Sequence, residues 1–125
     1  MVEQPNTPWA DARQIDSLED CYFYQTVDLP THGLQHGEWD LRGNVDAYLG
    51  SVALSGKRVL ELGTANGFVC FEMERRGAEV VGFDLGEGCD WDLVPFGGAK
   101  PSQVERHEIS RRLHNAWWLT HSLVG

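Results

Sequence analysis

Acidic residues and glycines recur between residues 61 and 84 at spacings that suit a ligand site. Glu61 lies two residues before Gly63, and Gly67 follows four residues after that first glycine. Glycine has no Cβ, so a ligand can approach the backbone closely at such positions. Where a helix starts after the loop, its unpaired N–H groups point toward the same crevice. The spacing therefore predicts a binding loop between the carboxyl end of a strand and the start of a helix.

The charge of this loop indicates which ligand it would hold. A dinucleotide loop has glycines in the spacing GxGxxG, which seats a pyrophosphate on the helix N-terminus, whereas Ala65 occupies the middle position here. The Glu61 carboxylate would repel a pyrophosphate and attract the ammonium group of a methionine moiety. Asp84, twenty-one residues after Gly63, could accept both hydroxyls of a ribose, and Leu85 would offer adenine an apolar surface. S-adenosylmethionine is therefore the predicted cofactor, and a dinucleotide-binding protein is the less favoured alternative.

Two strands and a helix must position this loop. Residues 58–62 and residues 79–83 are short apolar runs typical of buried strands. Residues 67–76 between them are predicted to be helical, and Gly77 is expected to stop this helix. The side chains expected to face the core are those of Phe68, Val69, Phe71 and Met73. A strand, a crossover helix and a second strand make a right-handed βαβ unit with parallel strands.

The flanking segments are expected to add a cap before this unit and a helix after it. The predicted elements of the cap are a helix over residues 7–18, an extended segment over 21–29, a loop over 31–38 and a short helix over 44–49. Ser102 and Glu105 have the S-x-x-E spacing of a capping box, so a helix is predicted from there to about Ser122. Its apolar stripe comprises Ile109, Leu113, Ala116, Trp117 and Leu123.

Residues 58–84 resemble motif I and the following acidic strand end of class I S-adenosylmethionine-dependent methyltransferases. A wider stretch, roughly residues 22–120, is similar to a bacterial group of methyltransferase-domain proteins related to the tRNA wobble-uridine methyltransferase-like family. The segments that carry this wider likeness are Tyr24-Gln-Thr-Val-Asp-Leu-Pro30, Trp39-Asp-Leu-Arg42, Gly56-Lys-Arg-Val-Leu-Glu-Leu-Gly-Thr64, Phe71-Glu-Met-Glu-Arg-Arg-Gly-Ala-Glu-Val80 and Trp117-Trp118. The tRNA chemistry of that family is not transferred to this chain, because a net charge of −9 gives no support for a nucleic-acid substrate.

The resemblance implies a set of cofactor-binding residues, namely Glu61, Gly63, Thr64, Asn66, Gly67, Asp84 and Leu85. The glycine loop would contact the methionine part of the cofactor through backbone groups. Glu61 would help to hold the amino group, Asp84 would bind the ribose hydroxyls, and Leu85 would touch the adenine. The methyl acceptor, a small molecule or another substrate, and the catalytic base are not assigned, and no metal site is expected.

Three further residues are candidates for a lid or a substrate pocket. In relatives the segment before motif I covers the cofactor, which brings Tyr24, Trp39 and Arg42 into consideration. Packing alone is the favoured role for Tyr24 and Trp39. For Arg42, a surface charge or a partner for a nearby acid is an equally good interpretation.

The resemblance also implies a fold class, which is α/β. Residues 57–125 are expected to form the start of a Rossmann-like methyltransferase sheet, a βαβ unit plus the following helix, and residues 1–56 an N-terminal helical or extended cap or lid. Such a sheet with two strands is incomplete, so the chain is interpreted as truncated. Parallel strands need both faces covered, and we therefore expect marginal stability, an exposed apolar patch and an aromatic stripe around Trp117 without partners.

Composition argues against several classes of protein. No apolar run approaches the roughly 20 residues of a membrane helix, and the N-terminus does not have the pattern of a secretory signal. The three cysteines include no CxxC pair, which disfavours a disulfide framework and a zinc site, and Cys70 is expected to be a buried thiol. A cytoplasmic location follows. The predicted function is methyl transfer by the full-length parent protein, and the alternative is a non-catalytic fragment that retains at most partial cofactor binding.

Overall fold

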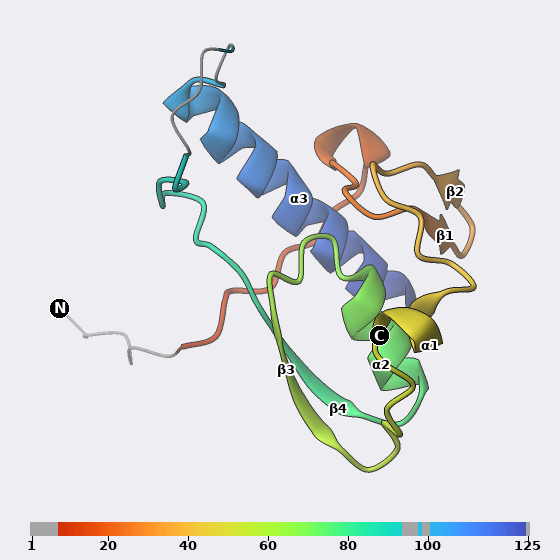
Figure 1. Cartoon of the computed structure of the whole chain (residues 1–125). Helices are drawn as coiled ribbons and strands as arrows, with labels where there is room; N and C mark the ends of the chain where they lie inside the picture. Colours follow the sequence, from red (N-terminus) through yellow and green to blue (C-terminus); the bar gives the residue numbers. More distant parts are fainter. Residues whose placement is uncertain (1–7, 94–97, 99–100, 125) are drawn as a thin grey trace, which may run out of the picture.

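The computed structural model describes residues 8–93, 98 and 101–124. Within these residues the chain is a mixed α/β protein with two small sheets and three α-helices (Figure 1). Its elements are the 3-10 turn η1 (Leu18–Asp20), β1 (Val27–Leu29), β2 (Gly33–Gln35), α1 (Val45–Tyr48), β3 (Arg58–Leu62), α2 (Phe68–Arg75), β4 (Glu79–Phe83) and α3 (Gln103–Val124).

The predicted strand–helix–strand unit is confirmed. Strands β3 and β4 have the expected bounds and pair in parallel, from Arg58 opposite Glu79 to Leu62 opposite Phe83. Helix α2 lies against one face of this sheet and buries all four predicted core side chains, together with Cys70. Its first residue follows Gly67, which adopts a left-handed conformation with φ +89°. Local periodicity was sufficient here, because the apolar residues recur at the periods of a strand and of a helix.

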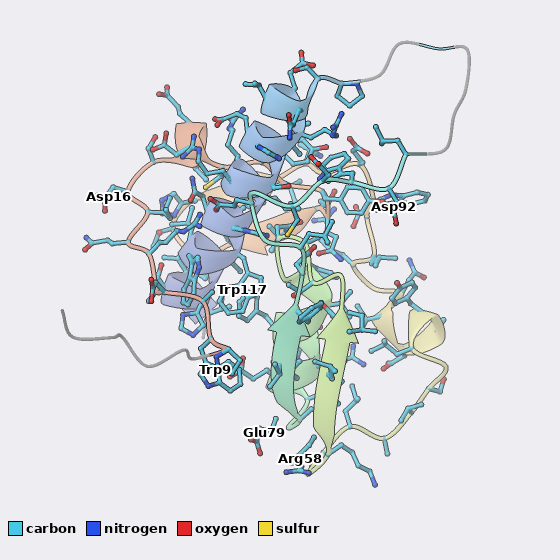
Figure 2. The ribbon with its side chains drawn as sticks, turned by 90° about the vertical axis from the view of Figure 1, so that its left-hand side faces the viewer. Trp9, Asp16, Arg58, Glu79, Asp92 and Trp117 are labelled. Carbon is cyan, nitrogen blue, oxygen red and sulfur yellow. The ribbon has the colours of Figure 1, made fainter. Side chains whose placement is uncertain are left out.

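The opposite face of the same sheet is exposed. Side chains alternate along a strand, so every second residue of β3 and β4 points away from α2. The apolar residues on this outer face are Leu60, Leu62, Val81 and Phe83, which are 61%, 73%, 36% and 59% exposed. In Figure 2 the sheet stands in front of α2, with the labelled Arg58 and Glu79 at its lower end. The structure thus shows the apolar surface that a two-stranded sheet was expected to leave open.

Helix α3 begins at the predicted capping box. The backbone N–H of Ser102 donates to Glu105 Oε2 (2.6 Å), and the backbone N–H of Glu105 donates to Ser102 Oγ (3.1 Å). The buried face of the helix differs from the predicted apolar stripe, since only Ala116 of that stripe is fully buried. The buried residues of α3 are Ser110, Asn115, Ala116, Leu119 and Thr120.

The N-terminal segment explains why Asn115 is buried, and its path differs from the predicted helix. Residues 8–17 form no helix; they run extended beside α3, where Arg13 Nη1 donates to Asn115 Oδ1 (3.0 Å). The Asn115 Nδ2 group donates in turn to the Asp20 carbonyl (2.9 Å). A short isolated helix is marginal by itself, and tertiary hydrogen bonds to α3 favour the extended path. Asn115 of α3 is therefore buried together with its partners in the N-terminal segment.

Two shorter elements also depart from the sequence prediction. Residues 33–35 of the predicted loop form β2, which pairs antiparallel with β1, so the extended segment 21–29 contributes a regular strand only at Val27–Leu29. Helix α1 lies within the predicted range 44–49; Val45 belongs to the buried core, and the partly buried Leu49 packs against it. The side chain of Asn44 makes no capping hydrogen bond. No helix in the described part of the chain is long and apolar enough to cross a membrane.

Candidate functional site

The glycine loop, residues 63–67, is hydrogen-bonded to the end of β4. The backbone N–H groups of Gly63 and Thr64 both donate to the Phe83 carbonyl, at 2.8 Å and 3.2 Å, and Gly67 N–H donates to the Thr64 carbonyl at 2.8 Å. Gly63 has φ +78°, and a Cβ placed on it would have no atom within 4 Å. The backbone at Gly63 therefore faces open space that a ligand can enter.

Asp84, the residue after β4, also forms a hydrogen bond with the glycine loop. Its Oδ2 accepts a hydrogen bond from Ala65 N–H (2.8 Å), and its Oδ1 accepts one from Leu85 N–H (2.8 Å). A carboxylate offers about four acceptor positions, so each oxygen keeps capacity for a further donor. The same side chain can thus position the loop and still accept hydroxyl groups from a ligand.

The side chain of Glu61, near the carboxyl end of β3, lies in an unusual environment. Both of its carboxylate oxygens are shielded from solvent and make no hydrogen bond of normal geometry with the described residues, although the Thr64 hydroxyl lies near enough to influence the carboxylate. Burial raises the pKa of Glu61 above its ordinary value; the Thr64 hydroxyl opposes the rise, and the Asp84 carboxylate adds to it. A cavity of about 230 Å³ includes Glu61 and Gly63 in its lining. A buried acceptor without a donor is energetically unfavourable, and a cationic donor in this cavity would satisfy it.

Asn66 connects the glycine loop to the N-terminal segment. Its side chain is fully buried: Oδ1 accepts from the N–H groups of Tyr24 (3.1 Å) and Gln25 (2.8 Å), and Nδ2 donates to the Gln25 carbonyl (3.1 Å). The Gln25 side chain completes the connection, because its Oε1 accepts from Phe68 N–H (3.1 Å), the first amide of α2. We call this set of hydrogen bonds the Gln25–Asn66 clamp.

The clamp has a consequence for the charge that the loop can accept. Phe68 N–H and Gly67 N–H are occupied by Gln25 and by the Thr64 carbonyl, and Ala65 N–H is occupied by Asp84. An anion at a helix N-terminus needs such amides to be free. The start of α2 is therefore poorly suited to a pyrophosphate.

A larger cleft of about 520 Å³ lies on the β4 side of the loop. Asp84, Leu85 and Thr64 line it together with Trp117 and Trp118 of α3. Trp117 Nε1 donates to Thr64 Oγ1 (3.2 Å), and its ring lies 5.0 Å from the ring of Phe71 and stacks on His121 at 5.3 Å. Trp117 therefore has partners in this structure, and the expectation of an aromatic stripe without partners was wrong. In Figure 2 Trp117 and Trp9 are labelled on the same side of the sheet, to its left.

Gly67 is enclosed by aromatic side chains. A Cβ on Gly67 would lie 2.6 Å from Phe71 Cε2 and 2.7 Å from Trp117 Cδ1. Both distances are shorter than the contacts that non-bonded carbon atoms make in proteins. The need for glycine here comes from packing against α2 and α3, whereas at Gly63 the space is open. The two glycines of the sequence pattern thus differ in their surroundings.

The three lid candidates fall into two groups. Trp39 Nε1 donates to the Tyr24 hydroxyl (2.7 Å), and the clamp holds the backbone of Tyr24 against Asn66, so this pair is tied to the glycine loop. Arg42 lies elsewhere: it makes a two-point ion pair with Asp40 (2.9 Å and 2.8 Å) and lines a separate cavity of about 700 Å³. Hydrogen bonds from the Arg42 side chain lower the pKa of Asp40 to about 2. Arg42 is therefore a surface charge paired with a nearby acid, as the alternative to a lid role expected.

Two residues of the site had no assigned role in the sequence analysis. Gln25 lay within an extended run, and nothing local indicated that its amide would cap a helix 43 residues later. Trp117 belonged to a predicted apolar stripe, and its contact with Thr64 spans 53 residues. Sequence periodicity reports neighbours on one element, and contacts of this range lie outside it.

The three cysteines are unpaired, with Cys21 and Cys70 buried and Cys89 exposed. Burial raises the pKa of the Cys70 thiol to about 11, and Glu61 contributes to the rise. This agrees with the predicted buried thiol. Among the residues that the structure describes, no group of three or more histidine, cysteine or acidic side chains could hold a metal ion.

Comparison with known proteins finds a short match to a methyltransferase. A stretch of 35 residues is 57% identical to ubiquinone biosynthesis O-methyltransferase from Hahella chejuensis (strain KCTC 2396). The stretch is 28% of this chain and 15% of that protein, so the chain matches only a small part of its relative. No family model matches the chain. No solved structure matches it either. The comparison indicates a relation to methyltransferases over this stretch.

Proposed function

We propose that residues 57–125 form the beginning of an S-adenosylmethionine-binding, Rossmann-like methyltransferase domain, with residues 1–56 as its cap. The observation that carries the proposal is the Glu61 carboxylate, whose two buried oxygens make no hydrogen bond of normal geometry beside the open backbone of Gly63. An ammonium group placed there would satisfy these oxygens and would favour the ionised form of the carboxylate. The short match to an O-methyltransferase supports the same cofactor class.

The remaining parts of the cofactor fit the cleft on the other side of the loop. Asp84 has acceptor capacity left for ribose hydroxyls, and Leu85 with the Trp117 and Trp118 rings supplies apolar walls for adenine. When bound, the cofactor would supply an electrophilic methyl group, and the chain would contribute its orientation toward an acceptor. The occupied amides at the start of α2 count against the dinucleotide alternative.

Isothermal titration calorimetry with S-adenosylhomocysteine tests the proposal, because this compound keeps both the ammonium group and the adenosine. The informative variant is Glu61→Gln, since the Glu61 side chain makes no hydrogen bond of normal geometry with a described residue. We expect it to weaken binding by about ten- to a hundredfold, as for loss of a charged hydrogen bond. Glu74→Gln removes an exposed carboxylate from α2 and serves as the matched control with unchanged affinity.

Two results would count against the proposal. One is the absence of binding by the folded chain, which would support a non-catalytic fragment. The other is tighter binding of NADH than of S-adenosylhomocysteine, which would support the dinucleotide alternative. Equal affinities for the Glu61→Gln variant and the unmodified chain would refute the role given to Glu61.

A further inference from the structure

Three segments that lie far apart in the sequence meet at the side chain of Glu87, in the loop after β4. Arg13 Nη2 of the N-terminal segment forms an ion pair with Glu87 Oε1, and His114 Nδ1 of α3 lies 3.5 Å from the same oxygen. Arg13 is held on α3 in turn, because its Nη1 group donates to Asn115 Oδ1 (3.0 Å). We call this set of contacts the Glu87 junction. The side chains of Arg13, Glu87 and His114 all line the cleft of about 520 Å³ that is the proposed adenosine site.

The loop that carries Glu87 depends on side-chain anchors for a fixed conformation. Glu87 stands between Gly86 and Gly88, and glycine leaves the backbone the widest choice of conformations. Asp84, where the loop begins, is fixed by its hydrogen bond to the glycine loop. Leu85, the residue proposed to touch adenine, is 47% exposed and lies between that anchor and the Glu87 junction. The junction is therefore the second point at which the chain can hold Leu85 in place.

We propose that Arg13 is a positioning residue for the cofactor, because its ion pair with Glu87 orders the loop that presents Leu85 to adenine. The inference rests on the proposed function, since it concerns the same cleft. A loop that becomes ordered only on binding takes its ordering free energy from the affinity, whereas a loop that is already ordered does not. The N-terminal cap thus raises the affinity for adenosine through a contact with the loop.

The ion pair lies where it can have this effect. The side chains of Arg13 and Glu87 are 33% and 31% exposed, so both are partly shielded from water. Shielding strengthens the attraction between opposite charges relative to a fully exposed pair. An arginine is always charged in proteins, and Arg13 is therefore expected to be the main partner of the Glu87 carboxylate.

Calorimetric titration with methylthioadenosine tests the proposal. This probe keeps the adenosine of the cofactor and lacks the ammonium group, so it does not depend on Glu61. Arg13→Gln and Glu87→Gln are each expected to weaken binding about fivefold, the scale of one partly shielded ion pair. The double variant should also lose about fivefold, because both changes remove the same contact, whereas independent contacts would multiply to about twenty-five-fold.

Two further variants separate positioning from a general loss of stability. Arg13→Lys keeps the positive charge beside Glu87 and should retain most of the affinity. Arg75→Gln removes a charge of the same kind from an exposed ion pair with Glu72 on α2, away from the cleft, and should leave binding unchanged.

Amide hydrogen exchange measures the order of the loop without any ligand. The Cys89 N–H donates to the Gly86 carbonyl within the loop (3.0 Å). It should exchange faster in the Arg13→Gln and Glu87→Gln variants, while the amides of β3 keep their protection. Unchanged exchange at Cys89 would overturn the proposal, because the junction would then not order the loop.

The titrations distinguish failure of this inference from failure of the proposed function. If the unmodified chain binds the probe and the Arg13→Gln variant binds it equally well, the role of Arg13 is refuted and the cofactor site stands. Losses that multiply in the double variant would show that Arg13 and Glu87 act separately, and would refute the junction as the cause. If the unmodified chain binds neither methylthioadenosine nor S-adenosylhomocysteine, the proposed function is refuted, and the role of Arg13 with it.

Discussion

Replacing Asn66 by alanine is expected to destabilise the chain strongly, although Asn66 is a polar residue in a loop. The substitution removes three hydrogen bonds of a fully buried side chain, two accepted from the Tyr24 and Gln25 amides and one donated to the Gln25 carbonyl. With roughly 1 kcal/mol for each of the three bonds lost and buried groups left unpaired, the free energy of unfolding should fall by about 3 kcal/mol. That is a large share of the stability of a small domain.

Urea unfolding monitored by circular dichroism measures this change, and amide hydrogen exchange locates it. The amides of Tyr24 and Gln25 should lose protection to a greater extent than those of β3, because only the former lose their acceptor. Asn44→Ala is the matched control: this asparagine is exposed, its side chain makes no capping hydrogen bond, and its removal should change stability by less than about 0.5 kcal/mol. If Asn66→Ala cost less than about 1 kcal/mol, the clamp would not hold the N-terminal segment to the glycine loop in the way described.

Two further predictions concern the glycines and the buried acid. Gly67→Ala should lower the free energy of unfolding by about 2–4 kcal/mol in urea titrations, from the clash with Trp117 and Phe71 added to left-handed strain. Gly63→Ala, with strain alone, should cost about 1–2 kcal/mol; equal losses would contradict the packing argument. Glu61→Gln should stabilise the chain at neutral pH, because a raised pKa in the folded state lowers the stability of the unmodified chain as pH rises above the ordinary glutamate value. Urea titrations at several pH values should show this gain disappearing below that value, and a gain constant with pH would exclude Glu61 as its source.

These predictions rest on a division of roles within one short loop. Glu61 and Gly63 face unfilled space and are available to a ligand, whereas Asn66 and Gly67 are occupied by the rest of the chain. Asp84 would have both functions under the proposed function, since its oxygens hold two amides and can accept further donors. A variant of Asp84 would therefore change stability and affinity together, which is why Glu61 is the better residue for testing the cofactor.

Sequence by itself determined the central unit of this protein and the character of its loop. The bounds of β3 and β4, the buried face of α2 and the capping box of α3 all follow from local periodicity and local hydrogen bonding, and the structure confirms them. The acidic residues around the glycines also indicate a cationic ligand through charge alone. These features depend on residues within one element or in adjacent turns, so a sequence pattern can report them.

Only the tertiary structure decided how the loop is held and which of its residues are free. The segment before η1 is extended because Arg13 and Asp20 bond to α3, and Gln25 caps α2 only because Asn66 fixes its backbone from 41 residues away. Trp117 likewise makes Gly67 a packing position. Such contacts form because buried donors and acceptors need hydrogen-bond partners. Which distant segment supplies the partner depends on the whole folded structure. The glycine spacing thus predicted a binding loop, and the folded structure separates its residues into those that support the loop and those that are open to a ligand.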